Sequence, residues 1–130
     1  MRIIITGSRN WEGPAAEAKV HEILNAVQFL AEALGSPLTV VHGDCPTGAD
    51  AIADRWARRR DSEGVELETY PANWGAEGKS AGFIRNLRMA EKGADLCFAF
   101  HRDLSPGTLH MIGSGESYRI PTFVITWEQI

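Results

Sequence analysis

Short apolar runs alternate with longer stretches of helical periodicity along the whole chain. The runs occupy residues 2–6, 38–42, 65–70, 95–100 and 122–126, and most of them are continuous in apolar character rather than alternating. Continuous apolar strands are typical of a parallel sheet that is covered on both faces, because neither side of such a strand meets water. The pattern therefore predicts about five parallel strands.

Four helices are predicted between these strands. The first begins near Pro14, has apolar residues at three- and four-residue spacing, and ends at Gly35. The second has one apolar face, and a charged run at residues 55–61 that we interpret as its solvated surface. The third runs from about residue 81 to 92 and the fourth from about 107 to 118. This order predicts an α/β fold, a Rossmann-like doubly wound sheet with helices on both faces.

Composition and charge narrow the class of protein. The chain has 130 residues, 44% of them hydrophobic, and its 13 basic and 17 acidic side chains give a formal charge of −4. This length fits a single domain, residues 1–130. The mild acidity argues against binding of nucleic acid through the overall field of the protein. Any anion site should therefore be local.

The sequence gives no sign of a metal site, a cofactor, a membrane span or a secretion signal. Cys45 and Cys97 lack metal-ligand spacing, so we expect no metal, and nothing in the sequence indicates a cofactor. No run approaches the roughly 20 apolar residues that span a bilayer, and no cleavable leader pattern precedes the first predicted strand. We expect a cytoplasmic protein without a membrane partner.

Glycine-rich loops follow three of the predicted strands, at residues 6–11, 42–50 and 105–108. Ligands of open α/β sheets bind beyond the carboxyl ends of the strands, where the strand order reverses. The backbone N–H groups of such loops, and the helix N-termini behind them, favour phosphate. Gly43 and Gly48 have the spacing of a Walker A loop, but Asp50 stands near where that loop has Lys and Ser/Thr, which argues against an NTPase.

Cationic side chains lie beside these loops. Arg85 is the best candidate for an anion clamp, because its guanidinium and the amide of Asn86 stand near the start of a helix. Arg9 lies in the first glycine loop, and Lys79 lies in a long polar segment at residues 72–82. We interpret that segment as a loop that is too rich in glycine for a helix and more often functional than idle.

Some of these residues have both a structural and a functional interpretation. Asp50 is either a helix-start residue favoured by the dipole or an acceptor for a ribose or a base. Trp11 and Trp74 either stack on a base or pack over the edge of the sheet. His110 lies near a loop end without a partner at a regular spacing, so it is a weak catalytic candidate.

In combination, the motifs resemble the YspA (YpsA-related) branch of the SLOG superfamily, and the resemblance covers nearly the whole chain. The segments that carry it are Gly7-Ser8-Arg9, Val41-His42-Gly43, residues 48–53, residues 70–74, Gly78-Lys79, residues 81–86 with Met89, Gly93-Ala94-Asp95, Gly107-Thr108 and His110-Met111. The resemblance implies a Rossmann-like fold and a site for a nucleotide or a nucleotide-derived ligand. It also implies a source in bacteria or their phages.

The chain is also similar to the LOG group, enzymes that hydrolyse the N-glycosidic bond of nucleoside 5′-monophosphates. The segment Ser105-Pro106-Gly107-Thr108 keeps the end of the LOG glycine motif, and Arg85 resembles the LOG helix arginine. The pair of glutamates that follows the LOG motif is replaced here by Leu109-His110-Met111. A carboxylate normally stabilises the oxocarbenium-like state or activates the water, so Asp44, Asp50 or Glu116 would have to substitute.

The leading hypothesis is a module that binds a nucleotide or a nucleotide-derived small molecule, as a sensor or a sequestering protein. Backbone N–H groups near Gly7–Ser8 and Gly107–Thr108 would hold phosphate, and Trp74 would cover the site. The predicted ligand-binding residues are Gly7, Ser8, Arg9, Gly43, Gly48, Asp50, Trp74, Lys79, Arg85, Asn86, Gly107 and Thr108.

Two other functions stay open. The first is a LOG-like N-glycosidase or phosphoribohydrolase, with catalytic candidates Arg85, Asp44, Asp50, Glu116 and His110. The second is binding of single-stranded DNA, as in the related DprA proteins, which the acidic balance makes the weakest. An apolar helix face left over in so small a chain would favour a homodimer.

Overall fold

The strands form one parallel sheet in the order β3-β2-β1-β4-β5 in the computed structural model, which describes residues 1–103 and 105–130. The strands are β1 (Arg2–Gly7), β2 (Thr39–His42), β3 (Glu66–Thr69), β4 (Leu96–His101) and β5 (Thr122–Thr126). Each lies within a residue of the run that predicts it. The expected Rossmann-like α/β sheet is confirmed.

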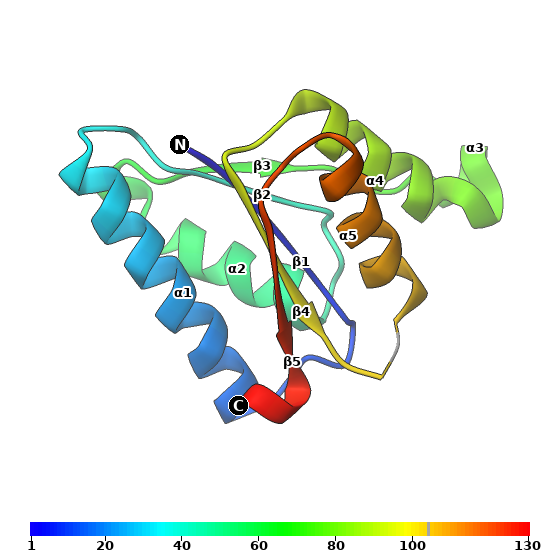
Figure 1. The fold of residues 1–130 in the computed structure, drawn as a ribbon, viewed down its shortest axis with the longest axis horizontal. Helices are drawn as coiled ribbons and strands as arrows, with labels where there is room; N and C mark the ends of the chain where they lie inside the picture. The colour runs from blue at the N-terminus through cyan, green and yellow to red at the C-terminus, as the bar shows by residue number, and fades with distance from the viewer. Residues whose placement is uncertain (104) are drawn as a thin grey trace.

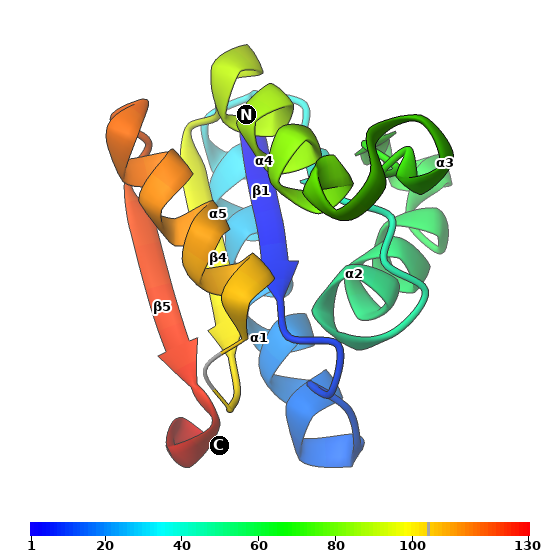
Figure 2. The same cartoon turned by 90° about the vertical axis from the view of Figure 1, so that its right-hand side faces the viewer.

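Helices cover both faces of the sheet (Figures 1 and 2). The helices are α1 (Pro14–Ala33), α2 (Gly48–Arg58), α3 (Trp74–Glu77), α4 (Ala81–Lys92) and α5 (Pro106–Ser117), with short 3-10 turns at Asp61–Glu63, Gly78–Ser80 and Trp127–Gln129. Helices α1 and α2 lie on one face, and α4 and α5 lie on the other. No helix of the described residues is long and apolar enough to cross a membrane.

The core has two halves, one on each face of the sheet. Ile3 and Ile5 of β1 pack with Leu24 of α1 and Trp56 of α2. Ile4 points the other way, as successive strand residues do, and belongs to the cluster that includes residues of α4 and α5. All three isoleucines are fully buried. This two-sided burial is the reason that the strands appear as continuous apolar runs in the sequence.

The segment 72–82 differs from its prediction. We expected a loop without helix, but α3 and the 3-10 turn Gly78–Ser80 run almost directly into α4. Asn73 allows this, because its side-chain oxygen accepts the N–H of Ala76 at 3.1 Å and caps the first turn. Gly78 follows with φ 60°, where glycine ends the turn without the strain that a side chain would add. The prediction that glycine excludes helix here is wrong.

The order of the strands determines where the loops meet. Strand β1 pairs with β2 on one side and with β4 on the other. The polypeptide therefore runs from β1 through β2 to β3 on one side, and then returns to β4 and β5 on the other side of β1. The segments that follow β1, β2 and β4 therefore gather at the carboxyl edge of the sheet, at the point where the strand order reverses.

Candidate functional site

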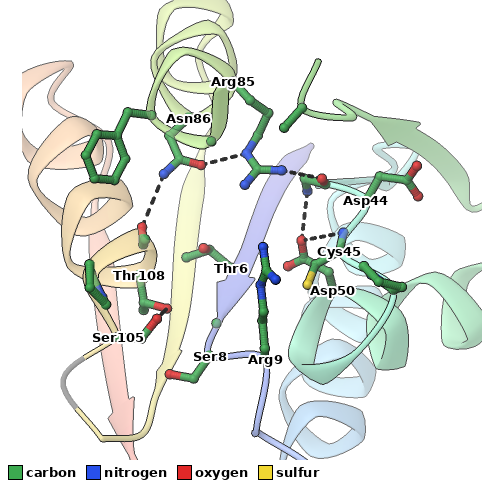
Figure 3. A pocket seen from close by; sticks show the side chains of 18 of the residues that line it. Thr6, Ser8, Arg9, Asp44, Cys45, Asp50, Arg85, Asn86, Ser105 and Thr108 are labelled. Atoms are coloured by element: carbon green, nitrogen blue, oxygen red, sulfur yellow. Dashed lines mark hydrogen bonds between the residues drawn. The ribbon is translucent and has the colours of Figure 1, made fainter. Parts of the chain in front are cut away.

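A cavity of about 640 Å³ opens at this edge (Figure 3). Its walls come from the segments after β1, β2, β3 and β4 and from the first turns of α4 and α5. The structure brings together most of the residues singled out in the sequence. Those that line the cavity are Gly7, Ser8, Arg9, Gly43, Asp44, Asp50, Trp74, Lys79, Arg85, Asn86, Gly107 and Thr108.

Three of the predicted ligand-binding and catalytic residues lie outside the lining of the cavity. Gly48 begins α2 with φ 74°, and a Cβ atom there would collide with the carbonyl oxygen of Ser8, so this glycine allows a close backbone approach. His110 lies next to Asn86. Glu116 is exposed near the end of α5, about 15 Å along the helix from the turn that borders the cavity.

The N-terminus of α5 is the first anion-binding feature of the cavity. The Gly107 N–H has no acceptor among residues 1–103 and 105–130, and the Ser105 side chain does not cap the helix. Instead, Thr108 Oγ1 donates to Ser105 Oγ at 3.2 Å. Free N–H groups at the positive end of a helix dipole favour an anion.

The polar groups of Ser8, in the loop after β1, bond to the protein itself, whereas we expected them to bind phosphate. The Ser8 N–H donates to the Phe100 carbonyl at 2.9 Å, and the Ser8 hydroxyl donates to the carbonyl of Arg102 and accepts its N–H. These bonds tie the loop to the end of β4. The N–H groups of Arg9 and Asn10, one and two residues further on, have no acceptor in the described part of the chain.

The charges that line the cavity are nearly balanced. Its basic side chains are Arg9, Lys79, Arg85 and Arg102, and its acidic ones are Asp44, Asp50 and Asp103. Arg9 and Lys79 form no ion pair with any described residue. The guanidinium of Arg102 already has partners within the protein, because it donates to the Asn10 carbonyl and lies 3.8 Å from the ring of Trp127. Arg9 and Lys79 are therefore the freest cations.

Arg85, on α4, joins that helix to the segments after β2 and β3. Its Nη1 donates to the carbonyl oxygens of Gly43 and Tyr70, and its Nε donates to Asn86 Oδ1 at 2.8 Å. The sequence also allows Arg85 to be a surface residue paired with Glu77 or Glu91. Neither pair is formed within the described residues, and Arg88 pairs with Glu77 at 3.0 Å instead. Arg85 thus contributes its positive charge to the cavity while it holds the cavity walls together.

Asp50 is a buried carboxylate with one free oxygen. Its Oδ2 accepts the N–H of Gly43 at 3.1 Å and that of Cys45 at 3.3 Å, whereas its Oδ1 is buried with no partner among the described residues. Burial raises the pKa of Asp50, although His42, the two N–H groups and Arg85 favour its charged form. Asp50 therefore anchors the loop after β2.

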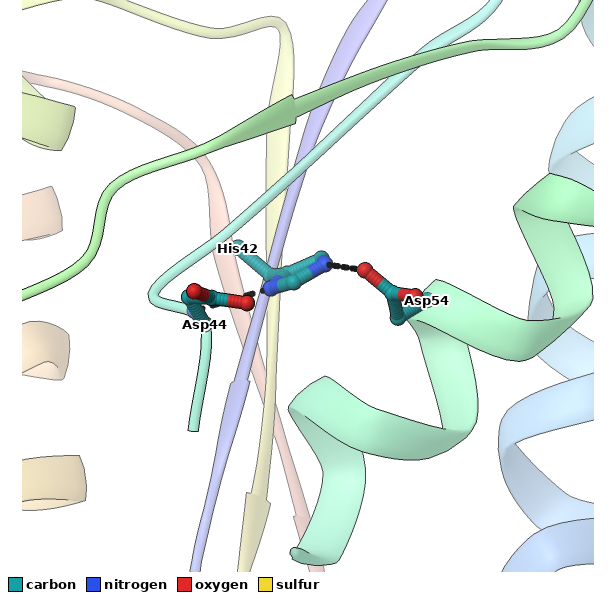
Figure 4. Close-up of side chains that lie close together, drawn as sticks. All are labelled: His42, Asp44 and Asp54. Carbon is teal, nitrogen blue, oxygen red and sulfur yellow. Dashed lines mark hydrogen bonds and ion pairs between the residues drawn. The ribbon is translucent and has the colours of Figure 1, made fainter. Parts of the chain in front are cut away.

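His42, Asp44 and Asp54 lie close together behind that loop (Figure 4). His42 Nε2 lies 2.8 Å from Asp54 Oδ2, and His42 Nδ1 accepts the N–H of Asp44 at 2.9 Å. The proton therefore belongs on Nε2. Burial opposes the charged form of Asp54, but hydrogen bonds from Arg58 and His42 outweigh it and lower the pKa of Asp54. Because both ring nitrogens are used, we interpret the cluster as structural.

The two loop tryptophans have different surroundings. Trp11 is fully buried between Phe100 and Trp127, each ring centroid 5.3 Å away, and donates Nε1–H to the Ala16 carbonyl at 3.0 Å. It is a plug. Trp74 is 51% exposed, lines the cavity, and lies against the first turn of α4, where Gly82 leaves room for its ring.

The cavity also has lining residues that the sequence did not single out. They include Cys45, Phe83, Arg102 and Asp103. Arg102 and Asp103 follow directly after β4, so the rule that ligands bind beyond the carboxyl ends of strands would have found them. Phe83 has no such signal, because it comes from an exposed position on α4.

Comparison with known proteins agrees with the motifs quoted above. The profile described as the YspA, cpYpsA-related SLOG family matches residues 1–76, which is more than half of the chain. The Gene 61 protein of Mycobacterium phage D29 is 40% identical over 125 residues, which cover 92% of each chain. No solved structure matches. The chain therefore belongs to the YspA, cpYpsA-related SLOG family.

Proposed function

We propose that the protein binds a phosphate-bearing nucleotide or nucleotide derivative in the cavity, as a sensor or a sequestering module. Membership of the SLOG family supports a nucleotide-related ligand in general. One observation carries the proposal: free anion-binding groups and an exposed aromatic ring border the same cavity. The groups are the N-terminus of α5 and the side chains of Arg9 and Lys79, and the ring is that of Trp74.

The volume and the chemistry of the cavity suit such a ligand. About 640 Å³ falls within the range of small-molecule sites. A phosphate would accept hydrogen bonds from the Gly107 N–H and from the side chains of Arg9 and Lys79. A base would lie against Trp74. The acidic side chains of Asp44 and Asp50 would disfavour a bare polyphosphate and favour a ligand that also carries hydroxyl or amino donors.

Binding is tested first with the purified protein and a panel of nucleotides. The protein is incubated with AMP, ADP-ribose, NAD and cyclic dinucleotides, the melting temperature is recorded, and the solution is analysed by chromatography. A rise in melting temperature with every nucleotide recovered intact supports a binding module. No rise with any of these compounds at millimolar concentration would contradict it.

Arg9→Gln and Lys79→Gln test the anion site. Neither cation has an ion-pair partner among the described residues, so both variants should keep the stability of the free protein. A hydrogen bond to a charged group contributes about 1.5–3 kcal/mol, so each variant should weaken nucleotide binding by roughly tenfold or more. Arg59→Gln is the matched control, because Arg59 is exposed at the end of α2 and lies outside the cavity lining. Equal losses in all three variants would reject the site.

A LOG-like N-glycosidase is the second candidate, and one observation favours it. Asp44 lies in the same cavity as Arg85 and is exposed, so its carboxylate is free to activate a water. That water would attack the anomeric carbon and lose its proton to Asp44, the N-glycosidic bond would break, and the departing base would take up a proton from solvent. Release of free base and ribose 5-phosphate from AMP, abolished in Asp44→Asn but with binding retained, is the expected result. Glu116 lies too far along α5 for this role.

A further inference from the structure

The side chain of Asn86 is at the centre of a hydrogen-bond chain among residues that line the cavity. It is only 3% exposed. Its Oδ1 accepts from Arg85 Nε at 2.8 Å, and its Nδ2 lies 3.2 Å from both the Gly107 carbonyl and His110 Nδ1. Arg85 Nε is a donor and the Gly107 carbonyl is an acceptor, so the amide has one satisfactory orientation. Nδ2 therefore donates to His110, and the neutral ring of His110 carries its proton on Nε2.

These hydrogen bonds continue along one side of the cavity (Figure 3). From Asn86 they run through the guanidinium of Arg85 to the carbonyl of Gly43, and the Gly43 N–H donates to Asp50 Oδ2 at 3.1 Å. On its other side, Asn86 bonds the first turn of α5 through Gly107. The side chain of one asparagine thus connects the loop after β2 with the N-terminus of α5. These are two walls of the proposed ligand site.

The ring of His110 is held by stacking against an aromatic side chain of α4. Phe83 stacks on it with centroids 4.2 Å apart and planes inclined by 15°. Of the charged side chains, Arg85 faces it from α4 across Asn86, and burial alone lowers the pKa of His110. No charge on β1, β4 or β5, the strands that pack against α5, contributes to that shift among the described residues.

We propose that His110 is a positioning residue of the site. In its neutral form it fixes the Asn86 amide, and through that amide the Arg85 guanidinium and the first turn of α5. Protonation would place an N–H on Nδ1, opposite the N–H of Asn86. The amide would then turn so that its Oδ1 accepts from the protonated ring, and Arg85 Nε would lose that acceptor. This inference rests on the proposed function only for its effect on ligands, because the hydrogen-bond chain exists in the free protein.

Nuclear magnetic resonance of the free protein tests the chain directly. The ring nitrogens of His110, the side-chain amide of Asn86 and the Nε–H of Arg85 are followed between pH 5 and 8. We expect the Asn86 and Arg85 signals to move with the same midpoint as His110. An Arg85 signal that does not follow His110 would overturn the proposal.

Three variants separate positioning from packing. His110→Asn places an amide oxygen near the position of Nδ1, so it should restore the Asn86 and Arg85 signals and make them independent of pH. His110→Leu keeps apolar contact with Phe83 but offers no acceptor, so it should displace both signals at every pH. His21→Asn, on α1 beside Glu17, is the control and should leave the titration unchanged. Identical spectra for the Asn and Leu variants at position 110 would refute the assigned role.

The affinity for AMP tests whether His110 also affects ligand binding. We expect the affinity of the unmodified protein, divided by that of His110→Asn, to fall as the pH is lowered through the midpoint that His110 shows in the spectra. Below that midpoint the fall should approach about tenfold, the loss of one hydrogen bond to a charged group. The ratio removes the titration of the AMP phosphate, whose second pKa near 6 affects both proteins equally. Failure of AMP to bind would count against the proposed function, whereas the spectra would still decide the role of His110.

Discussion

The buried carboxylate of Asp50 is unfavourable for stability but suited to bind a hydrogen-bond donor of a ligand. It is 6% exposed, its Oδ2 bonds two backbone N–H groups, and its Oδ1 has no partner among the described residues. A buried charge that is only partly satisfied opposes folding. A ligand that donates a hydrogen bond to Oδ1 would reduce this unfavourable free energy.

Asp50→Asn should therefore change the dependence of stability on pH. The pKa of Asp50 is raised in the folded protein from 3.8, so the folded state holds this proton more tightly than the unfolded state. Stability contributed by that proton is present below pH 3.8 and is lost as the pH rises through the raised pKa. Urea unfolding at pH 4.5 and 7.5 should show the original protein losing stability relative to the variant. A difference that is constant or that grows with pH would contradict the prediction.

The two cysteines should differ sharply in reactivity. Cys97 is fully buried, and burial raises its pKa to about 12, so its thiol stays protonated at pH 8. Cys45 is half-buried and lines the cavity. Native protein treated with iodoacetamide should be alkylated at Cys45 alone, as read by peptide mass spectrometry. Cys45→Ser should then remain unlabelled, and labelling of Cys97 without denaturant would contradict the assigned burial.

Some residue roles could be predicted from the sequence and others could not. Trp11 and Trp74 both follow polar loop residues, and local sequence does not separate them. What separates them is distant: Phe100 and Trp127 enclose the first ring, whereas the second lies beside Gly82 at the cavity. The positive charge of Arg85 near the site was predictable. Its bonds to the carbonyls of Gly43 and Tyr70 were not, because they depend on how α4 meets the segments after β2 and β3.

At the scale of the elements, glycine has two separate uses, one at the end of β1 and one in the first turn of α5. At Gly7 a Cβ would lie 2.6 Å from Ala49 Cβ and 2.8 Å from the Phe100 carbonyl oxygen, so β1 is pressed between α2 and β4. At Gly107 a Cβ would meet no atom within 4 Å among the described residues outside the backbone of its own helix. The first glycine serves packing. The second leaves the backbone of α5 open to the cavity.

Gly7→Ala and Gly107→Ala form a matched pair that separates these uses. Overpacking against backbone costs about 1–3 kcal/mol, so Gly7→Ala should lower the free energy of unfolding by that amount. Gly107→Ala should not destabilise the free protein, since alanine is favoured over glycine in a helix. It should still reduce the melting-temperature shift caused by nucleotides, because the added methyl group hinders approach to the N–H groups. A destabilised Gly107→Ala or an unaffected Gly7→Ala would contradict this assignment, measured by urea unfolding.

The elements themselves were largely predictable. Strands buried on both faces leave continuous apolar runs, and helix ends are indicated by Pro14 and Gly93, so periodicity and end signals located them. The missed element is α3. Its capping by Asn73 replaces the apolar periodicity that a four-residue helix is too short to display. A cap without a periodic stretch is a weak signal in sequence.

At the scale of the whole molecule, strand order and charge define what the site can accept. The sequence predicts parallel strands but not the position at which their order reverses, which only the pairing of β1 with β4 reveals. The net charge of −4 surrounds a cavity whose basic side chains outnumber its acidic ones by one. Single-stranded nucleic acid needs a basic groove that follows several phosphates, and this distribution favours a small nucleotide instead.

The surface beside the cavity bears on the oligomeric state, which the sequence leaves open. Phe83 and Leu87 on α4 and Leu109 on α5 are each more than 40% exposed, and α5 carries a single charged residue, Glu116. A helix that faced water on its outer side would normally be charged there. A twofold interface places the same patch of two copies in contact, and α4 contributes both signs of charge, Arg88 and Glu91, beside the apolar side chains.

We therefore predict a dimer that joins α4 and α5 of two copies. Sedimentation should give twice the mass of the chain at micromolar concentration, and Leu87→Lys should give the mass of one chain, because two buried lysines would face each other without partners. Leu34→Lys is the control, since Leu34 is 64% exposed just beyond the end of α1, on the other face of the sheet. Dissociation by Leu34→Lys but not by Leu87→Lys would place the interface on that other face. Because Phe83 lines the cavity, a dimer through α4 and α5 would also bring the second copy next to the ligand site.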